Sequence, residues 1–231
     1  MNILQKICQH NYFATIYINF RMLPLKQAVR LPIDIYRHVK LQKLAGKMEI
    51  RSEHIYRGMI KFGGRGSDMF SGGKLILEIE DGGTWIIQGA TEIGFGCFLH
   101  ISRGAVLFTG DNVRIGARTK IYCNKEITIG EQVDISWESQ VFDTNFHFMK
   151  NIDDNTVFLK DGIIRIGSHN WFGNRCNIMK GTITPNNTIV ASNSLTNKDY
   201  TQTIGQYTLM AGTPAKVMKT NVKRLFEGED I

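Results

Sequence analysis

The chain has 231 residues, a formal net charge of +7, and 42% hydrophobic residues including 10% aromatic ones. This composition supports a folded core and excludes global disorder. The charge is concentrated, because residues 1–48 hold eight Lys or Arg and one acid, whereas the other 183 residues hold 20 of each sign. The body of the chain is therefore formally neutral, which argues against nucleic-acid binding.

The sequence carries no signal for export or for spanning a membrane. No stretch approaches the roughly 20 apolar residues needed to cross a bilayer, and Lys6, His10 and Asn11 interrupt any apolar region near Met1. We therefore expect a cytoplasmic protein. The cysteines lie far apart without metal-ligand spacing, so we expect reduced, mostly buried thiols. They are Cys8, Cys97, Cys123 and Cys176.

Residues 1–48 form a basic segment that we expect to be partly helical. The helical character runs from Lys26 to Leu44, with Pro32 as a start or a break. Its cations are mixed with apolar side chains such as Tyr12, Phe13 and Phe20. This mixture suits either a packed cap on the end of the fold or contact with an anionic membrane surface.

From Ile93 onward the chain repeats every six residues. An aliphatic residue begins each unit, Gly often follows, and a small residue stands four positions after the aliphatic one, as in Ile93-Gly94 and Cys97. Five consecutive units keep this register after an interruption. They begin at Ile166, Phe172, Ile178, Thr184 and Val190.

A period of six fits neither a helix nor an amphipathic strand, which have periods of 3.6 and 2. It is typical of a chain that turns a corner every six residues and so forms a triangular coil of short parallel strands. The aliphatic residue fills the axis, and Gly is favoured after it, where the backbone bends. The sequence thus predicts an all-β fold, a parallel β-helix over residues 49–216. The Gly-rich residues 49–92 are its irregular early coils, and residues 217–231 form a short C-terminal helix and tail.

The chain resembles the hexapeptide-repeat acyltransferases, and within them the O-acetyltransferases of bacterial capsule, lipopolysaccharide and polysialic acid. The resemblance covers roughly residues 50–219. It depends on the repeats, on Asp143 to His147, on Asn170 to Gly173 and on Ala211 to Lys216. It implies a left-handed coil, a homotrimer with active sites between neighbouring subunits, and acetyl-CoA as the co-substrate.

The segment 147–163 interrupts the repeat with many polar residues, and we expect a loop ejected at a corner. His147 stands at its start. Transfer of an acetyl group to a sugar hydroxyl needs a base near neutral pH, for which His is suited, and the resembled family places its catalytic His at the corresponding position. Asp143 and Asn145 are candidates for orienting the imidazole or binding the acceptor sugar. The alternative for Asp143 is a side chain that caps a corner.

Trp171 is the second catalytic candidate, because a Trp in this relation to the His contributes to the active site of the polysialic acid O-acetyltransferases that the chain resembles. The alternative is an outer aromatic packed against the loop. The family holds acetyl-CoA along the later coils. The matching residues here are Lys180, Gly181, Ser192, Asn193, Thr213, Pro214, Ala215 and Lys216.

These features predict an acetyl-CoA-dependent O-acetyltransferase acting on a sugar or surface polysaccharide through a ternary complex, because no Ser or Cys is paired with a base as an acyl-enzyme would need. An amino-sugar N-acetyltransferase is the first alternative, and a non-enzymatic β-helix scaffold is the second. The fold also hosts zinc enzymes with three His ligands. Since His100, His147 and His169 lack the expected close pair, we expect no metal.

Overall fold

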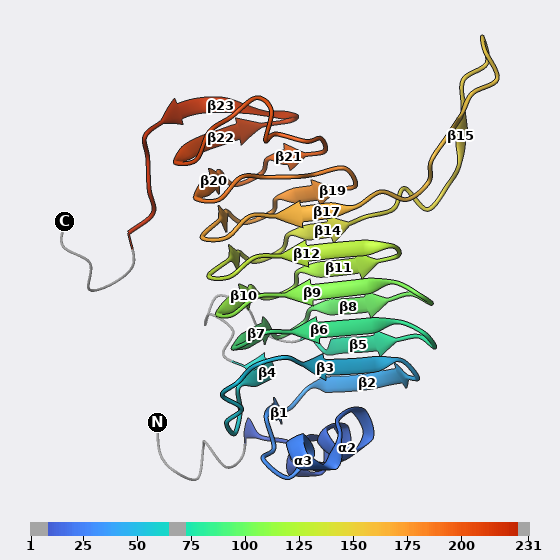
Figure 1. The fold of residues 1–231 in the computed structure, drawn as a ribbon, viewed down its shortest axis with the longest axis vertical. Helices are drawn as coiled ribbons and strands as arrows, with labels where there is room; N and C mark the ends of the chain where they lie inside the picture. The colour runs from blue at the N-terminus through green and yellow to red at the C-terminus, as the bar shows by residue number, and fades with distance from the viewer. Residues whose placement is uncertain (1–8, 65–72, 226–231) are drawn as a thin grey trace.

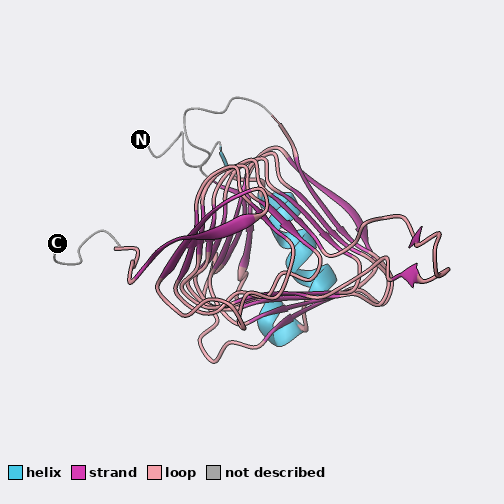
Figure 2. Ribbon diagram, turned by 90° about the horizontal axis from the view of Figure 1, so that it is seen from above, coloured by secondary structure: helices cyan, strands magenta, loops and turns pink. Residues whose placement is uncertain are grey.

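The structure is a computed structural model that describes residues 9–64 and 73–225. Its strands form three faces of a triangular prism, stacked coil upon coil (Figures 1 and 2). The prism is a parallel β-helix, because each strand pairs in parallel with the equivalent strand of the coils below and above. Ile115, for example, pairs with Ile93 below it and Ile135 above it.

Each face is a stack of strands from successive coils. The first face contains β1 (Ile33–Ile35), β4 (Ile60–Gly64), β7 (Thr91–Gly94), β10 (Val113–Ile115), β13 (Asp134–Ile135), β18 (Trp171–Phe172), β20 (Thr188–Val190) and β22 (Thr208–Gly212). The second face contains β2 (Val39–Leu44), β5 (Leu75–Ile79), β8 (Phe98–Ile101), β11 (Lys120–Cys123), β14 (Gln140–Phe142), β19 (Asn177–Met179) and β21 (Leu195–Thr196). The third face contains β3 (Lys47–Ile50), β6 (Thr84–Ile87), β9 (Val106–Thr109), β12 (Glu126–Ile129) and β17 (Ile164–Ile166).

The predicted inward positions are buried. The residues that begin the units, from Ile93 to Val190, are at most 4% exposed where the repeat predicted them. The small residues four positions later are buried too, among them Thr119, Ser139 and Ser194. The six-residue period thus fixed which side chains fill the axis.

Glycine follows the aliphatic residues for a reason other than the expected bend of the backbone. A Cβ on Gly116 would lie 2.5 Å from the backbone nitrogen of Trp137, and one on Gly130 would lie 2.7 Å from that of Ser168. Both contacts are with the next coil. Left-handed backbone instead occurs two residues later, as at Arg118 (φ 58°) and Gln132 (φ 51°). Glycine is therefore required by the close approach of successive coils.

The N-terminal segment closes the open end of the first coil. Helix α2 (Tyr12–Met22) begins after Asn11, whose side chain accepts a hydrogen bond from the Ala14 amide at 3.1 Å. The buried Asn19 side chain donates to the Ile33 carbonyl at 2.7 Å and accepts from the Ile33 amide at 3.1 Å. The short helix α3 (Leu25–Ala28) follows. Together they cover a strand edge that would otherwise be unpaired.

Three boundary predictions are wrong. Residues 26–44 form only the short α3, followed by β1 and β2, because β1 pairs with β4 and β2 with β5. The first coil therefore begins at Ile33, ahead of the predicted boundary at residue 49. The predicted C-terminal helix from residue 217 is instead β23 (Ala215–Thr220), antiparallel to β22, then an extended chain. Residues 226–231, which were predicted to end the helix and form an acidic end, lie outside the described residues.

Candidate functional site

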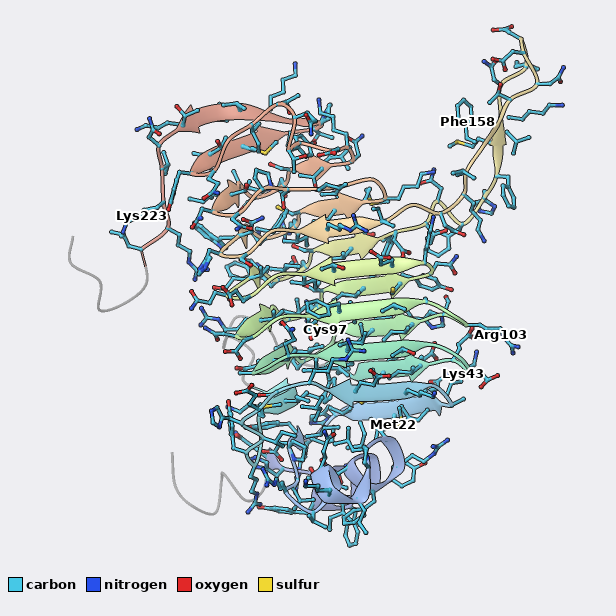
Figure 3. All side chains as sticks on the ribbon, in the orientation of Figure 1. Met22, Lys43, Cys97, Arg103, Phe158 and Lys223 are labelled. Atoms are coloured by element: carbon cyan, nitrogen blue, oxygen red, sulfur yellow. The ribbon has the colours of Figure 1, made fainter. Side chains whose placement is uncertain are left out.

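The predicted loop leaves the prism in the fifth coil, at the corner between the second and third faces. It extends outward as a hairpin of β15 (Met149–Lys150) and β16 (Val157–Phe158), and Figures 1 and 3 show it projecting from the stack, with Phe158 labelled. The two arms meet at its root, where the Asn145 amide donates to the Lys160 carbonyl at 3.0 Å. The loop is thus closed at its base and exposed at its tip.

Asp143 stands just before this root and is fully buried. Its carboxylate accepts hydrogen bonds from three consecutive backbone amides of the coil below, those of Asn124, Lys125 and Glu126, at 2.7–2.8 Å. Burial raises the pKa of the Asp143 carboxyl, and the three backbone donors act against that rise. The sugar-binding role predicted for Asp143 is therefore corrected, because the side chain caps a corner and does not reach solvent.

An aromatic column supports the loop root from the outer side of the second face. The Phe146 ring packs edge-to-face on Tyr122 at 4.9 Å and on Phe142 at 5.7 Å between centroids. His147 follows Phe146 directly, is exposed, and has no hydrogen bond or ion pair to any residue that the structure describes. The position of its backbone is therefore set by its neighbour, and its imidazole is open to a ligand.

The column continues downward into a buried polar pair. Tyr122 stacks on His100 at 4.4 Å, and His100 Nδ1 lies 2.8 Å from a Glu78 carboxylate oxygen. The second ring nitrogen of His100 lies 3.2 Å from the Ser102 hydroxyl. The sequence analysis found no role for His100. No motif marks His100 in the sequence. Only the strand register places it between Glu78 of the coil below and Tyr122 of the coil above.

Trp171 lies on the first face, in the coil above the loop's coil, and is 37% exposed. Its indole nitrogen donates to the Ser136 hydroxyl at 3.2 Å. The guanidinium of Arg224 lies over its ring at 5.2 Å and also pairs with Asp134. Sequence reasoning missed Ser136 and Arg224, because neither belongs to a motif, and only the return of the chain along the first face brings Arg224 there.

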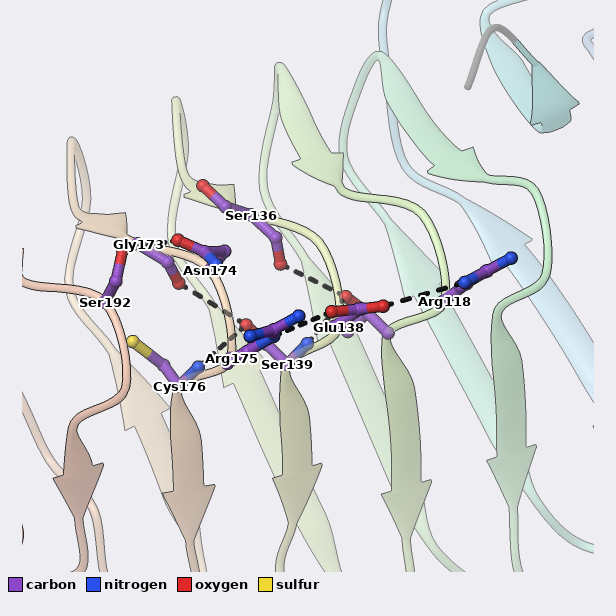
Figure 4. Close-up of polar contacts among 10 residues, drawn as sticks. Arg118, Ser136, Glu138, Ser139, Gly173, Asn174, Arg175, Cys176 and Ser192 are labelled. Carbon is purple, nitrogen blue, oxygen red and sulfur yellow. Dashed lines mark hydrogen bonds and ion pairs between the residues drawn. The ribbon is translucent and has the colours of Figure 1, made fainter. Parts of the chain in front are cut away.

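The corner between the first and second faces carries part of the predicted acetyl-CoA site. The Ser192 hydroxyl donates to Asn174 at 2.5 Å, and the Asn193 carbonyl accepts from the Thr213 hydroxyl at 3.4 Å. Below them, Glu138 bridges Arg118 and Arg175 across three successive coils (Figure 4). This corner is thus a continuous polar ridge.

Two of the predicted acetyl-CoA residues lie at a different corner. Lys180 and Gly181 are at the corner of the loop, one coil above it, where Lys180 donates to the Leu159 carbonyl and the Gly181 amide donates to the Ile163 carbonyl at 2.9 Å. Lys180 therefore already holds the returning arm of the loop. Of the terminal turn, Ala215 is buried, whereas Pro214 and Lys216 are exposed.

Within one chain the structure does not bring His147 and Trp171 together. His147 is at the corner between the second and third faces, and Trp171 belongs to the first face. The predicted cofactor residues are divided in the same way between two corners. A site that used both candidates would need residues from two copies of the chain.

The described thiols are shielded from solvent. Cys97, Cys123 and Cys176 are free and buried, as the sequence predicted, while Cys8 lies outside the described residues. Burial raises the pKa of Cys97 to about 12 and also raises those of Cys123 and Cys176. In the described part of the chain, no three His, Cys, Asp or Glu side chains gather as a metal site would require. No described helix is both long and apolar enough to span a bilayer.

Comparisons with known proteins place this geometry in a context. No protein-family model matches the chain. Over 134 residues it is 28% identical to WbbJ of Escherichia coli K12, a protein to which O-acetyl transfer in lipopolysaccharide biosynthesis is ascribed, and the match covers 54% of this chain. The crystal structure of NeuO, a polysialic acid-specific acetyltransferase, superposes with a TM-score of 0.61 at 19% identity, covering 84% of this chain and 91% of that one.

The chain resembles the hexapeptide-repeat acyltransferases. The fold that it shares with NeuO is the left-handed parallel β-helix, which confirms the fold predicted from the repeat. The match spans 66% of the length of WbbJ, just under two thirds. A hexapeptide-repeat acetyltransferase of Vibrio cholerae, crystallised with acetyl-CoA, is 25% identical over 49% of this chain and 60% of its own. Its TM-score of 0.40 does not establish a shared fold over the chain.

Proposed function

We propose that the chain is an acetyl-CoA-dependent O-acetyltransferase that modifies a hydroxyl group of a sugar or surface polysaccharide, with His147 as the general base. The observation that carries this proposal is the exposed His147 at the root of the ejected loop, in a β-helix like that of NeuO. The sequence similarity to WbbJ supports O-acetylation. The formally neutral body of the chain is also compatible with an uncharged or weakly charged acceptor.

The chemistry follows from the side chain. The imidazole of His147 takes the proton of the acceptor hydroxyl as its oxygen attacks the thioester carbonyl of acetyl-CoA. The tetrahedral intermediate then collapses, the carbon–sulfur bond breaks, and the proton passes to the departing thiolate. Direct transfer is favoured over an acyl-enzyme, because the described thiols are buried and held in their protonated form.

The substitution His147→Ala tests this role. We expect kcat to fall by about 10²- to 10⁴-fold. The affinity for acetyl-CoA and the number of subunits in the assembly should not change, since the exposed ring supports no other side chain. His54→Ala is the matched control, because His54 is also exposed and lies in the loop after β3. Near-normal turnover in His147→Ala would remove His147 from the mechanism.

We further propose that the active unit is a homotrimer whose sites lie between subunits. The separation of His147 and Trp171 within one chain supports this arrangement. So does the projecting hairpin, whose apolar side chains need cover, with Phe148, Ile152 and Leu159 exposed by 70%, 92% and 76%. Light scattering should give three times the chain mass of 26.2 kDa.

Subunit complementation tests the shared site. His147→Ala and Trp171→Ala should each be nearly inactive as pure assemblies. If each site takes His147 from one chain and Trp171 from its neighbour, random equal mixing restores roughly a quarter of the sites. No recovery after verified subunit exchange would show that the two residues do not serve one shared site.

The two alternatives predict other outcomes. Paired acceptors that differ only in a hydroxyl or an amine separate O- from N-acetylation. A scaffold without activity would neither bind acetyl-CoA nor release its thiol with a panel of capsule and lipopolysaccharide fragments. The same panel, followed by the mass increase of one acetyl group, identifies the acceptor.

A further inference from the structure

Helix α2 has one face that packs on the fold and a second, apolar face that does not. The inner face packs on the first coil through buried Thr15, Ile18, Asn19 and Met22. On the outer face, Phe13, Ile16, Tyr17 and Phe20 follow the spacing of one helix stripe and are exposed by 90%, 52%, 55% and 50%. Nothing in the described fold covers this stripe.

The exposed stripe continues into the next turn of chain. Leu25 and Val29, in and just after α3, are 68% and 60% exposed. Figure 1 shows both helices at one end of the prism, opposite β22 and β23. The large exposed apolar side chains of this region therefore gather at the N-terminal end of the molecule, where they form what we call the cap surface: Tyr12, Phe13, Ile16, Tyr17, Phe20, Leu25 and Val29.

The cap surface is also cationic. Residues 9–32 contain Arg21, Lys26 and Arg30, all exposed, and no acidic residue. An apolar stripe flanked by Lys and Arg, with tyrosines among its aromatic residues, is the pattern of helices that lie in the interface of an anionic bilayer. The helix is also too short to span one, since 11 residues extend about 16 Å.

A second copy of the chain is a poorer occupant. Two cap surfaces facing each other would place cations against cations with no acidic partner in residues 9–32. An anionic lipid surface instead supplies both the apolar interior and the opposite charge. Charge complementarity thus selects the membrane.

We infer that the cap surface docks the protein on the anionic phospholipid surface of a membrane. This inference concerns binding and is tested without measuring acetyl transfer. It also fits the proposed function, because a membrane-docked enzyme would meet a lipid-linked glycan. Four coil spacings separate β2 from β14, so the loop root would stand about 19 Å beyond the first coil.

Vesicle flotation tests the inference with the full chain. We expect the protein to float with phosphatidylcholine vesicles that contain about one third phosphatidylglycerol, at about 0.05 M salt. It should stay behind with pure phosphatidylcholine, and about 0.5 M salt should release most of it. Equal flotation with neutral and anionic vesicles, or none with either, would overturn the inference.

Two sets of variants separate the apolar and electrostatic contributions. Phe13→Ser with Phe20→Ser should weaken binding at least about tenfold. The triple variant R21Q/K26Q/R30Q should weaken it by about 100-fold. The matched controls are V217S/M218S, at exposed apolar positions of β23, and R103Q/K120Q/K219Q, at exposed cations away from the cap; both should bind like the wild type.

Circular dichroism and the mass of the assembly establish that each variant is folded, so a loss of flotation reports on the cap surface. Controls that lose binding as much as the cap variants would contradict the assignment to α2. A doubling of the assembly mass at low salt, abolished by F13S/F20S and without flotation, would identify the occupant as a second copy and overturn the membrane.

Discussion

Two corners of the same β-helix are built differently, although both serve to turn the chain. From the third coil to the seventh, the corner between the first and second faces joins its two strands through only three or four residues, with Glu138 between Arg118 and Arg175 on its outside. The corner between the second and third faces is interrupted in the fifth coil by the loop that carries His147. There a buried carboxylate, Asp143, and an aromatic column replace the regular contacts.

The difference teaches where an insertion needs support. A regular corner is held by the coils above and below it, so exposed ion pairs add little. A corner that ejects a long loop loses those neighbours on one side. The backbone amides of the coil beneath, at residues 124–126, then need other hydrogen-bond acceptors, and the Asp143 carboxylate provides them.

The largest expected effect is on Asp143. Asp143→Ala should lower the free energy of unfolding by about 3 kcal/mol, because three backbone amides lose a charged acceptor. Urea denaturation followed by circular dichroism measures it. Asp143→Asn should lose less, since one amide oxygen still accepts. A change below about 0.5 kcal/mol in Asp143→Ala would show that the corner does not depend on its cap.

Tyr122 is expected to affect catalysis more than stability. Tyr122→Leu removes the ring that holds Phe146 next to His147, and we expect kcat/KM to fall about tenfold through misplacement of the base. Steady-state kinetics should show a lower kcat with little change in the KM for acetyl-CoA. Tyr56→Leu is the control, because Tyr56 is 53% exposed in the loop after β3, away from the aromatic column. Equal losses in both variants would argue against positioning.

The regular corner should tolerate the loss of its charge. Glu138→Gln should change the free energy of unfolding by at most about 0.5 kcal/mol, because both of its arginine partners are well exposed. Denaturation at low and high salt measures this effect. A loss as large as that of Asp143→Ala would remove the contrast between the two corners.

The smallest expected effect concerns the thiols on the inside of the regular corner. With a pKa of about 12, Cys97 has about one thiolate in ten thousand at pH 8. It should stay unlabelled by a thiol reagent that modifies free cysteine within minutes, and Cys176 should resist too, because burial raises its pKa. Peptide mass spectrometry measures the labelling. Rapid labelling of either thiol in the folded protein would show that this corner opens readily.

Prediction from sequence succeeded where one local rule repeats. The positions of Ile115, Thr119 and Ile135 follow from the period alone, because every coil presents the same environment. It failed at the two ends. The mixture of Leu and Lys in residues 39–44 suits a helix as well as a strand, and pairing with β5 decides for the strand. The segment after Lys216 likewise became a strand because the free edge of β22 was available.

The candidate site shows the same division. The sequence predicted the loop, since a break in a strict period is visible by itself, and the family resemblance indicated His147 as the candidate at its start. It did not reveal that Asp143 points inward, that Phe146 packs on Tyr122, or that Trp171 lies on a different face from His147. These relations join residues from different coils, and their separation in the chain depends on the irregular lengths of the corners between them.

The sequence by itself determined the coil, its inward residues, the place of the insertion and the concentration of positive charge in the first 48 residues. The tertiary structure decided which elements and which exposed side chains lie beside that charge. Residues 9–48 divide between a helical cap and the first coil, and the outer stripe of α2 stays uncovered. A period describes only the neighbours that every coil has in common, whereas the ends of the stack have a neighbour on one side only.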